Sequence, residues 1–115
     1  MAMWCMAATP VPPPTPRPEI FGVTADSSTV VPGESVTISV NANLATTHAW
    51  MVTSSGETYN MYPAMGVIES KYFSASFTPV VSGNVTVYAN TNSSTSGAVS
   101  RSIYIGLYEF SIHPI

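Results

Sequence analysis

The sequence has 115 residues, 45% of them apolar, with three basic and six acidic side chains and a formal net charge of -3 at pH 7. A chain of this length buries roughly two-thirds of its unfolded surface, which permits one domain with a hydrophobic core and excludes two. Three basic residues are too few for the phosphate contacts on which nucleic-acid affinity depends, so we expect no nucleic-acid partner. Serine and threonine supply 29 residues, and such a hydroxyl-rich surface suits an extracellular or virion protein.

Cysteine use and targeting signals narrow the class further. Cys5 is the one cysteine, so no disulfide can form within the chain, although pairing between chains stays open. The segment MAMWCMAATPV has no basic residue before its apolar run, and Thr9 and Pro10 break that run, so we expect no cleavable export signal. No stretch approaches the ~20 consecutive apolar residues that cross a bilayer, and we expect no membrane insertion.

Residues 1–18 are expected to form a Pro-rich apolar docking arm. Six of the ten prolines fall between Pro10 and Pro18, where fixed φ angles and missing N–H groups exclude helix and central strand and favour polyproline II. A disordered tether is the ordinary interpretation of such a terminus. We favour docking because apolar side chains would supply contacts. The expected contact residues are Met1, Met3, Trp4, Met6, Val11, Pro12, Pro13 and Pro14.

Residues 19–108 show short alternating apolar runs between clusters of Gly, Pro, Asn and Ser, which is typical of an antiparallel all-β domain. We expect a first strand over 20–25, continued by 29–31, and a turn at Pro32-Gly33. The alternation over 35–42 predicts a half-buried strand.

Two more strands are expected next, the second weaker than the first. Over 47–53 we expect the parity of His48, Trp50 and Val52 to face the core. Residues 57–62 are expected to form an edge strand that Pro63 ends.

The second half of the domain continues the pattern. We expect strands over 71–77, around 85–89 and over 98–108, with a corner at 78–83 and an exposed hairpin loop at 90–97. Residues 109–115 then form a C-terminal tail. Seven or eight such strands fit a two-sheet antiparallel sandwich. Its predicted core comprises Val36, Ile38, Val40, Trp50, Phe73, Phe77, Val85, Val87, Ile103 and Ile105.

The order of these signals resembles bacterial-type immunoglobulin-like domains, a group that includes PKD-like and phage-virion modules. The matching stretches are PGESVTISVNA, HAWMV, YFSASFTPVVSGNVTVYA and SRSIYI. The resemblance implies an immunoglobulin-like sandwich in which Trp50 is the core aromatic of the third strand, and Phe77, Gly83 and Val87 belong to the later corner. Val85 stands where the family usually has an aromatic residue, and no antibody-type disulfide is present, so the resemblance is to the cysteine-free branch.

Catalytic patterns are sparse. The carboxylates occur singly beside turns, without an Asp-x-Asp run, and two histidines, His48 and His113, are too few for a typical catalytic zinc. The motif Gly-x-Ser-x-Gly is missing. We expect no enzymatic activity, no metal and no cofactor.

Exposed aromatic side chains are the candidate binding residues. They can stack on sugars or anchor a protein interface, or they can simply cover a sheet face. The candidates are Tyr59, Tyr62, Tyr88, Tyr104 and Tyr108.

Two functional hypotheses follow. The first is a structural assembly protein, a virion component such as a phage capsid decoration or tail or fibre protein, or a filament subunit, whose arm docks on a neighbour. Its partner would be a second copy or a larger assembly. The alternative is an extracellular bacterial adhesion or carbohydrate-binding module with a glycan partner. The expected location is the virion or the extracellular surface.

Overall fold

A computed structural model describes residues 16–64 and 70–108. These residues form an all-β domain without a helix, as the sequence predicts. Most of the expected arm, including all its predicted contact residues, and the expected tail lie outside the described residues. The strands are β1 (Ile20–Ala25), β2 (Thr29–Val30), β3 (Val36–Ala42), β4 (His48–Val52), β5 (Thr58–Ala64), β6 (Lys71–Phe77), β7 (Gly83–Asn90) and β8 (Val99–Leu107).

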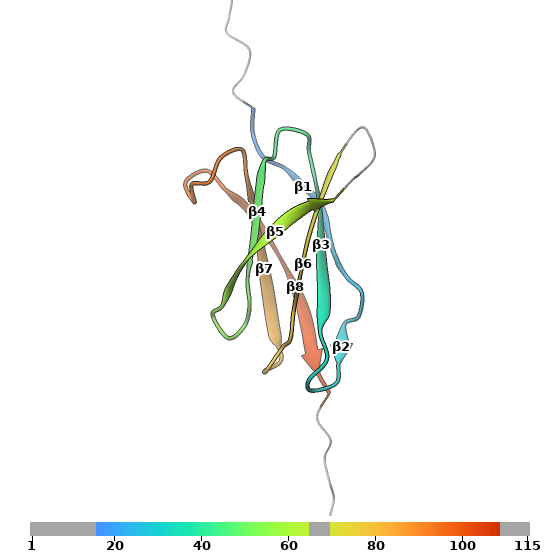
Figure 1. The fold of residues 1–115 in the computed structure, drawn as a ribbon. Helices are drawn as coiled ribbons and strands as arrows, with labels where there is room; N and C mark the ends of the chain where they lie inside the picture. The colour runs from blue at the N-terminus through green and yellow to red at the C-terminus, as the bar shows by residue number, and fades with distance from the viewer. Residues whose placement is uncertain (1–15, 65–69, 109–115) are drawn as a thin grey trace, which may run out of the picture.

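The eight strands pair as one mixed sheet in the order β1-β3-β6-β5-β4-β7-β8-β2 (Figure 1). The sheet curls, so that β1 also lies beside β8. The base of the arm enters at one end of the curl, and β8 leaves at the opposite end (Figure 1). The two ends of the domain therefore face in opposite directions.

β2 does not simply continue β1, as the sequence led us to expect. β1 pairs with β3 in antiparallel fashion, whereas β2 pairs in parallel with the end of β8, with Thr29 opposite Gly106. The Gly106 amide also donates to the Ser28 carbonyl at 2.8 Å. The polar residues between β1 and β2 thus let the chain change partners.

β5 is also different from the expected edge strand that stops before Pro63. Its first half pairs with β4, and its second half, which contains Pro63, pairs with β6. Each half of β5 pairs with only one of these two strands, so each half has one edge without a partner strand. Pro63, which has no N–H group to donate, is therefore tolerated in the strand. This change of partner along β5 is where the sheet bends.

The expectation that Trp50 fills the core is wrong. β4 turns Ala49 and Met51 inward, and Met51 is fully buried, whereas Trp50 is half-buried and His48 is exposed. Both parities of HAWMV carry apolar side chains, so alternation alone does not choose between them. The core aromatic that the family resemblance implies is replaced on this strand by methionine.

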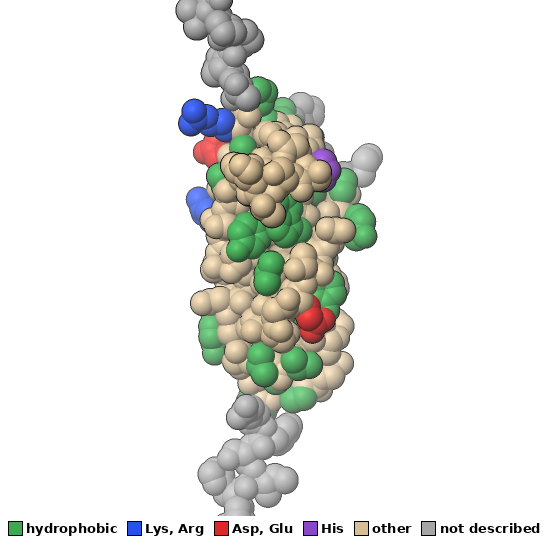
Figure 2. Space-filling view, turned by 90° about the vertical axis from the view of Figure 1, so that its left-hand side faces the viewer, with side chains coloured by type: hydrophobic (Ala, Val, Ile, Leu, Met, Phe, Trp, Pro, Cys, Tyr) green, Lys and Arg blue, Asp and Glu red, His purple; other side chains and the backbone are tan. Residues whose placement is uncertain are grey.

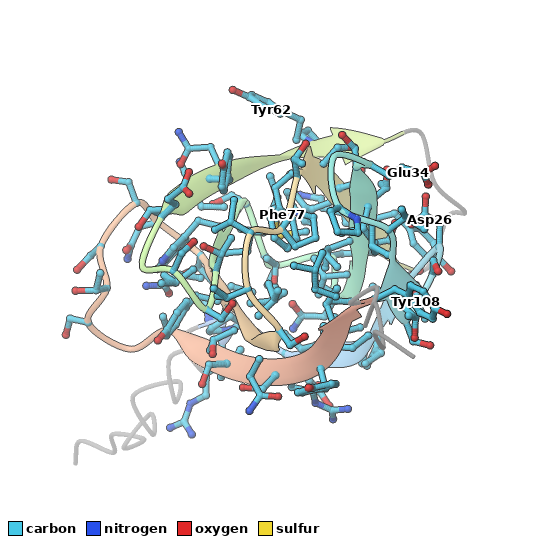
Figure 3. All side chains as sticks on the ribbon, turned by 90° about the horizontal axis from the view of Figure 1, so that it is seen from below. Asp26, Glu34, Tyr62, Phe77 and Tyr108 are labelled. Carbon is cyan, nitrogen blue, oxygen red and sulfur yellow. The ribbon has the colours of Figure 1, made fainter. Side chains whose placement is uncertain are left out.

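The remaining core follows the predicted alternation. Phe77 lies inside the curl, whereas Tyr62 points away from it (Figure 3). Ile103 is partly buried against the same core. The predicted residues that are buried are Val36, Ile38, Val40, Phe73, Phe77, Val85, Val87 and Ile105, and the structure adds Ile20, Val30, Ala49, Met51 and Met61.

Candidate functional site

Trp50 and Tyr88 form a stacked aromatic pair on the outer face of the sheet. They are direct cross-strand partners on β4 and β7, with ring centroids 5.6 Å apart and an interplanar angle of 11°. Asn60 on β5 lies opposite Trp50, and Ser100 on β8 lies opposite Tyr88. The pair is therefore the centre of a row that crosses four strands.

An open groove of about 510 Å³ lies over this face, between β4, β5 and the loop that follows β7. Figure 2 looks onto this side and shows hydrophobic side chains, in green, below the projecting loop. None of the described residues that line the groove is Lys, Arg, Asp or Glu, so the chemistry of this lining is aromatic and neutral polar. The lining residues are His48, Ala49, Trp50, Thr58, Asn60, Met61, Tyr62, Ser93 and Thr95.

Several donors of the groove are available to a ligand. Among the described residues, the side chains of Trp50, Asn60 and Tyr62 make no hydrogen bond. Tyr62 is 69% exposed at the rim. The indole N–H, the amide and the phenol can therefore serve an incoming group that carries acceptors.

The loop that borders the groove, residues 91–97, is organised by one buried side chain. Asn90 is 2% exposed, and its amide nitrogen donates to the carbonyls of Ser94, at 2.6 Å, and Ser96, at 3.0 Å. Its amide oxygen accepts from the Thr91 amide at 2.8 Å. The expected hairpin loop is exposed beyond Thr91, as predicted, but Asn90 holds it in a defined shape.

A second cleft, of about 450 Å³, lies where the arm joins the domain, and Pro16, Arg17 and Pro18 form one of its walls. Asn90, Ser96 and Gly97 are among the residues opposite.

Asn43, in the β3–β4 turn, holds the base of the arm in place. Its amide nitrogen donates to the Arg17 carbonyl at 2.7 Å, and its amide oxygen accepts from the Glu19 amide at 3.2 Å. The Asn43 backbone amide also donates to the Glu19 carbonyl at 3.0 Å. The chain is thus part of the domain from Arg17 onward, two residues earlier than the predicted boundary.

The candidate tyrosines are dispersed. Tyr62 and Tyr88 lie on the groove side, and Tyr104 is 59% exposed on β8. Tyr59 instead packs against the core, 6.1 Å from the Phe77 ring, and Tyr108 ends β8, where its amide donates to the Val30 carbonyl.

Among the described titratable groups, Tyr59 is the one with a clear pKa shift. Its hydroxyl donates to the Glu57 carboxylate at 2.7 Å. This hydrogen bond raises the pKa of Tyr59 above 10.0, and desolvation and the charge of Glu57 act in the same direction. The contact links the last residue of the β4–β5 turn to the start of β5.

The described acidic and imidazole groups form no centre. In the part of the chain that the structure describes, no three His, Cys, Asp or Glu side chains lie close enough to hold a metal ion. Within the same residues no helix has the length and apolar content to span a membrane. Asp26 serves the fold, since its carboxylate accepts from the Thr37 amide at 3.0 Å.

Sequence reasoning does not find three residues that form the candidate site or organise its loops. Alternation predicts that Trp50 faces the core, whereas its actual position depends on the neighbouring strands. Asn43 and Asn90 each directly follow or end an alternating run, and an asparagine there is a recognised signal for side-chain capping of the next turn. That signal could have identified both as organisers of the loops.

No protein-family model matches the sequence, and no curated protein matches it.

Proposed function

We propose that this chain is a non-enzymatic structural protein that assembles through its N-terminal arm, as a virion component or a filament subunit. The proposal is supported by a surface rich in hydroxyl groups, by the low number of charged side chains and by the isolation of the described carboxylates. A surface of this composition suits protein contacts better than proton-transfer chemistry, which needs grouped titratable residues.

We further propose that the curled sheet is an immunoglobulin-like sandwich. In the seven-strand form of that architecture, the first, second, fourth and fifth strands make one sheet, and the third, sixth and seventh make the other. If the short β2 is left out of the count, β1, β3, β5 and β6 correspond to the first sheet and β4, β7 and β8 to the second. The observed orders β1-β3-β6-β5 and β4-β7-β8 follow this scheme, and β5 also joins the two groups at the bend. The short β2 that crosses to β8 also supports this arrangement.

The observation that carries the assembly function is the attachment of the arm by Asn43. Two side-chain hydrogen bonds hold Arg17 and Glu19 at the end of the domain, opposite the point where β8 leaves it. A fixed base limits the directions that the preceding residues can take, which lowers the entropy lost when the arm docks. The prolines that precede the base act in the same way.

The test is sedimentation velocity of the full chain with Met1, Met3, Trp4 and Met6 replaced by serine. We expect the unchanged chain to form oligomers and the variant to sediment as a monomer with an unchanged β-sheet circular dichroism spectrum. Val80→Ser is the matched control, because Val80 is an apolar side chain that is 62% exposed outside the arm. Equal assembly of the arm variant and the unchanged chain would refute the proposal.

A further inference from the structure

The groove over Trp50 has the chemistry of a site for polyproline II. A polyproline II segment has no internal hydrogen bonds, so its backbone carbonyls are free to accept from a partner, and its proline rings pack on aromatic faces. The groove is lined by Trp50, whose ring stacks on Tyr88, by the exposed Tyr62 and by the amide of Asn60. The groove therefore offers both aromatic faces for the proline rings and hydrogen-bond donors for the backbone carbonyls of such a segment.

The sequence itself contains a segment that matches. Residues 10–15 read PVPPPT and carry no charge, and the described lining of the groove contains no Lys, Arg, Asp or Glu. A charged peptide would leave its charges without partners in the groove and would lose affinity for that reason, whereas an uncharged peptide does not bear this cost. Six residues in polyproline II extend roughly 19 Å, enough to cross the roughly 10 Å between β5 and β7.

The position of the arm's base favours the groove of another copy. Pro16 and Arg17 line the second cleft together with Asn92 and Ser96, whereas Ser93 and Thr95 line the groove. The loop 91–97 therefore stands between the base of the arm and the groove of its own chain. Residues 10–18 contain no glycine that would let the chain reverse directly before this base.

We propose that residues 10–15 of one copy bind, as polyproline II, in the groove over Trp50 of a second copy. This inference rests on the proposed assembly function and names its receiving surface. The contact is heterologous, because arm and groove are different surfaces, so it links copies into rings or open filaments.

The first experiment mixes two full-length variants. One carries Trp50→Ala, and the other has Pro12, Pro13 and Pro14 replaced by alanine. We expect each variant alone to sediment as a monomer where the unchanged chain assembles. An equimolar mixture should form a 1:1 complex, because one variant supplies an intact arm and the other an intact groove. A mixture that stays monomeric would overturn the proposal that the arm binds the groove of another copy. That result is also the one expected if each arm binds the groove of its own chain.

The second experiment titrates the full-length chain that carries the three proline substitutions with the uncharged peptide PVPPPT. Calorimetry measures the affinity, and NMR follows the Trp50 indole N–H in the chains that retain Trp50. We expect Trp50→Ala in this chain to weaken binding about tenfold or more. Tyr62→Ala should also weaken binding, and its exposed position excludes loss of the fold as the cause. Tyr104→Ala is the matched control, an exposed tyrosine on β8 away from the groove lining. A peptide with alanine in place of its prolines should not bind.

The outcomes separate this inference from the function on which it rests. If the proline substitutions abolish assembly while Trp50→Ala and Tyr62→Ala leave it intact, the arm docks elsewhere and the groove assignment is wrong. If the unchanged chain is monomeric, the assembly function itself is refuted. If the Trp50 signal responds to a neutral oligosaccharide such as cellohexaose and not to the peptide, the groove is a sugar site and the inference is overturned.

Discussion

The side-chain amide of Asn43 donates to the carbonyl oxygen of Arg17 across 26 positions of sequence, and this contact joins the arm to the β3–β4 turn. The same side chain accepts a 2.6 Å hydrogen bond from the hydroxyl of Thr46, which is fully buried. One residue therefore shapes the turn and holds the chain that precedes β1.

Asn43→Ala should lower the free energy of unfolding by about 1–3 kcal/mol, because the buried Thr46 hydroxyl loses its acceptor. Hydrogen exchange should also become faster at the Glu19 amide, which donates to Asn43. Urea unfolding and amide exchange measure the two effects. Asn60→Ala, at an exposed asparagine, is the control and should change stability by less than about 0.5 kcal/mol. Unchanged exchange at Glu19 would contradict the assignment.

Met51→Ala should destabilise the domain more than Trp50→Ala, although tryptophan is the larger side chain. Met51 is fully buried, and its truncation should cost about 2–5 kcal/mol through lost burial and a cavity. Trp50→Ala mainly removes the stacking on Tyr88, and such aromatic pairs contribute about 0.5–1.5 kcal/mol beyond burial. Urea midpoints of the two variants decide the order. A larger loss of stability for Trp50→Ala would contradict this assignment and indicate that Trp50 is the core residue of β4.

Gly83→Ala should destabilise the domain by about 1–3 kcal/mol. A Cβ atom at this position would lie 2.5 Å from Ser54 Cβ, so the β4–β5 turn would have to move. Ser54→Gly in the same chain should recover most of the loss, which thermal melts of the single and double variants would measure. Gly22→Ala is the control, because a Cβ there meets nothing within 4 Å. Equal losses with and without Ser54→Gly would rule out this clash.

Glu57→Gln should lower the pKa of Tyr59 toward its ordinary value of 10.0, because the carboxylate that accepts its proton and opposes its ionisation is removed. In the unchanged chain the pKa is higher when folded than when unfolded, so the associated stability is present below pH 10 and is lost as the pH rises through the folded value. The ¹³Cζ chemical shift of Tyr59 reports its titration. Identical titration curves in the two chains would exclude this contact.

The all-β class, the Pro32-Gly33 turn and most of the core could be predicted because they depend on local chemistry. In β3 every second residue is apolar and the others are polar, so one face can be buried and the pattern has a single solution. The Pro-Gly pair sets one φ angle and permits the positive φ of 93° at Gly33. Neither result needs knowledge of a distant residue.

The candidate site depended on contacts between strands that are far apart in the sequence. In β4 both faces carry apolar side chains, and the pairing of Trp50 with Tyr88 on one face and the burial of Met51 on the other decide which is which. The groove likewise combines β4, β5 and the loop after β7, and Asn90 gives that loop its shape from a buried position. Alternation reports how a strand divides its residues between two faces, but only the packing of the other strands determines which of two similar faces excludes water.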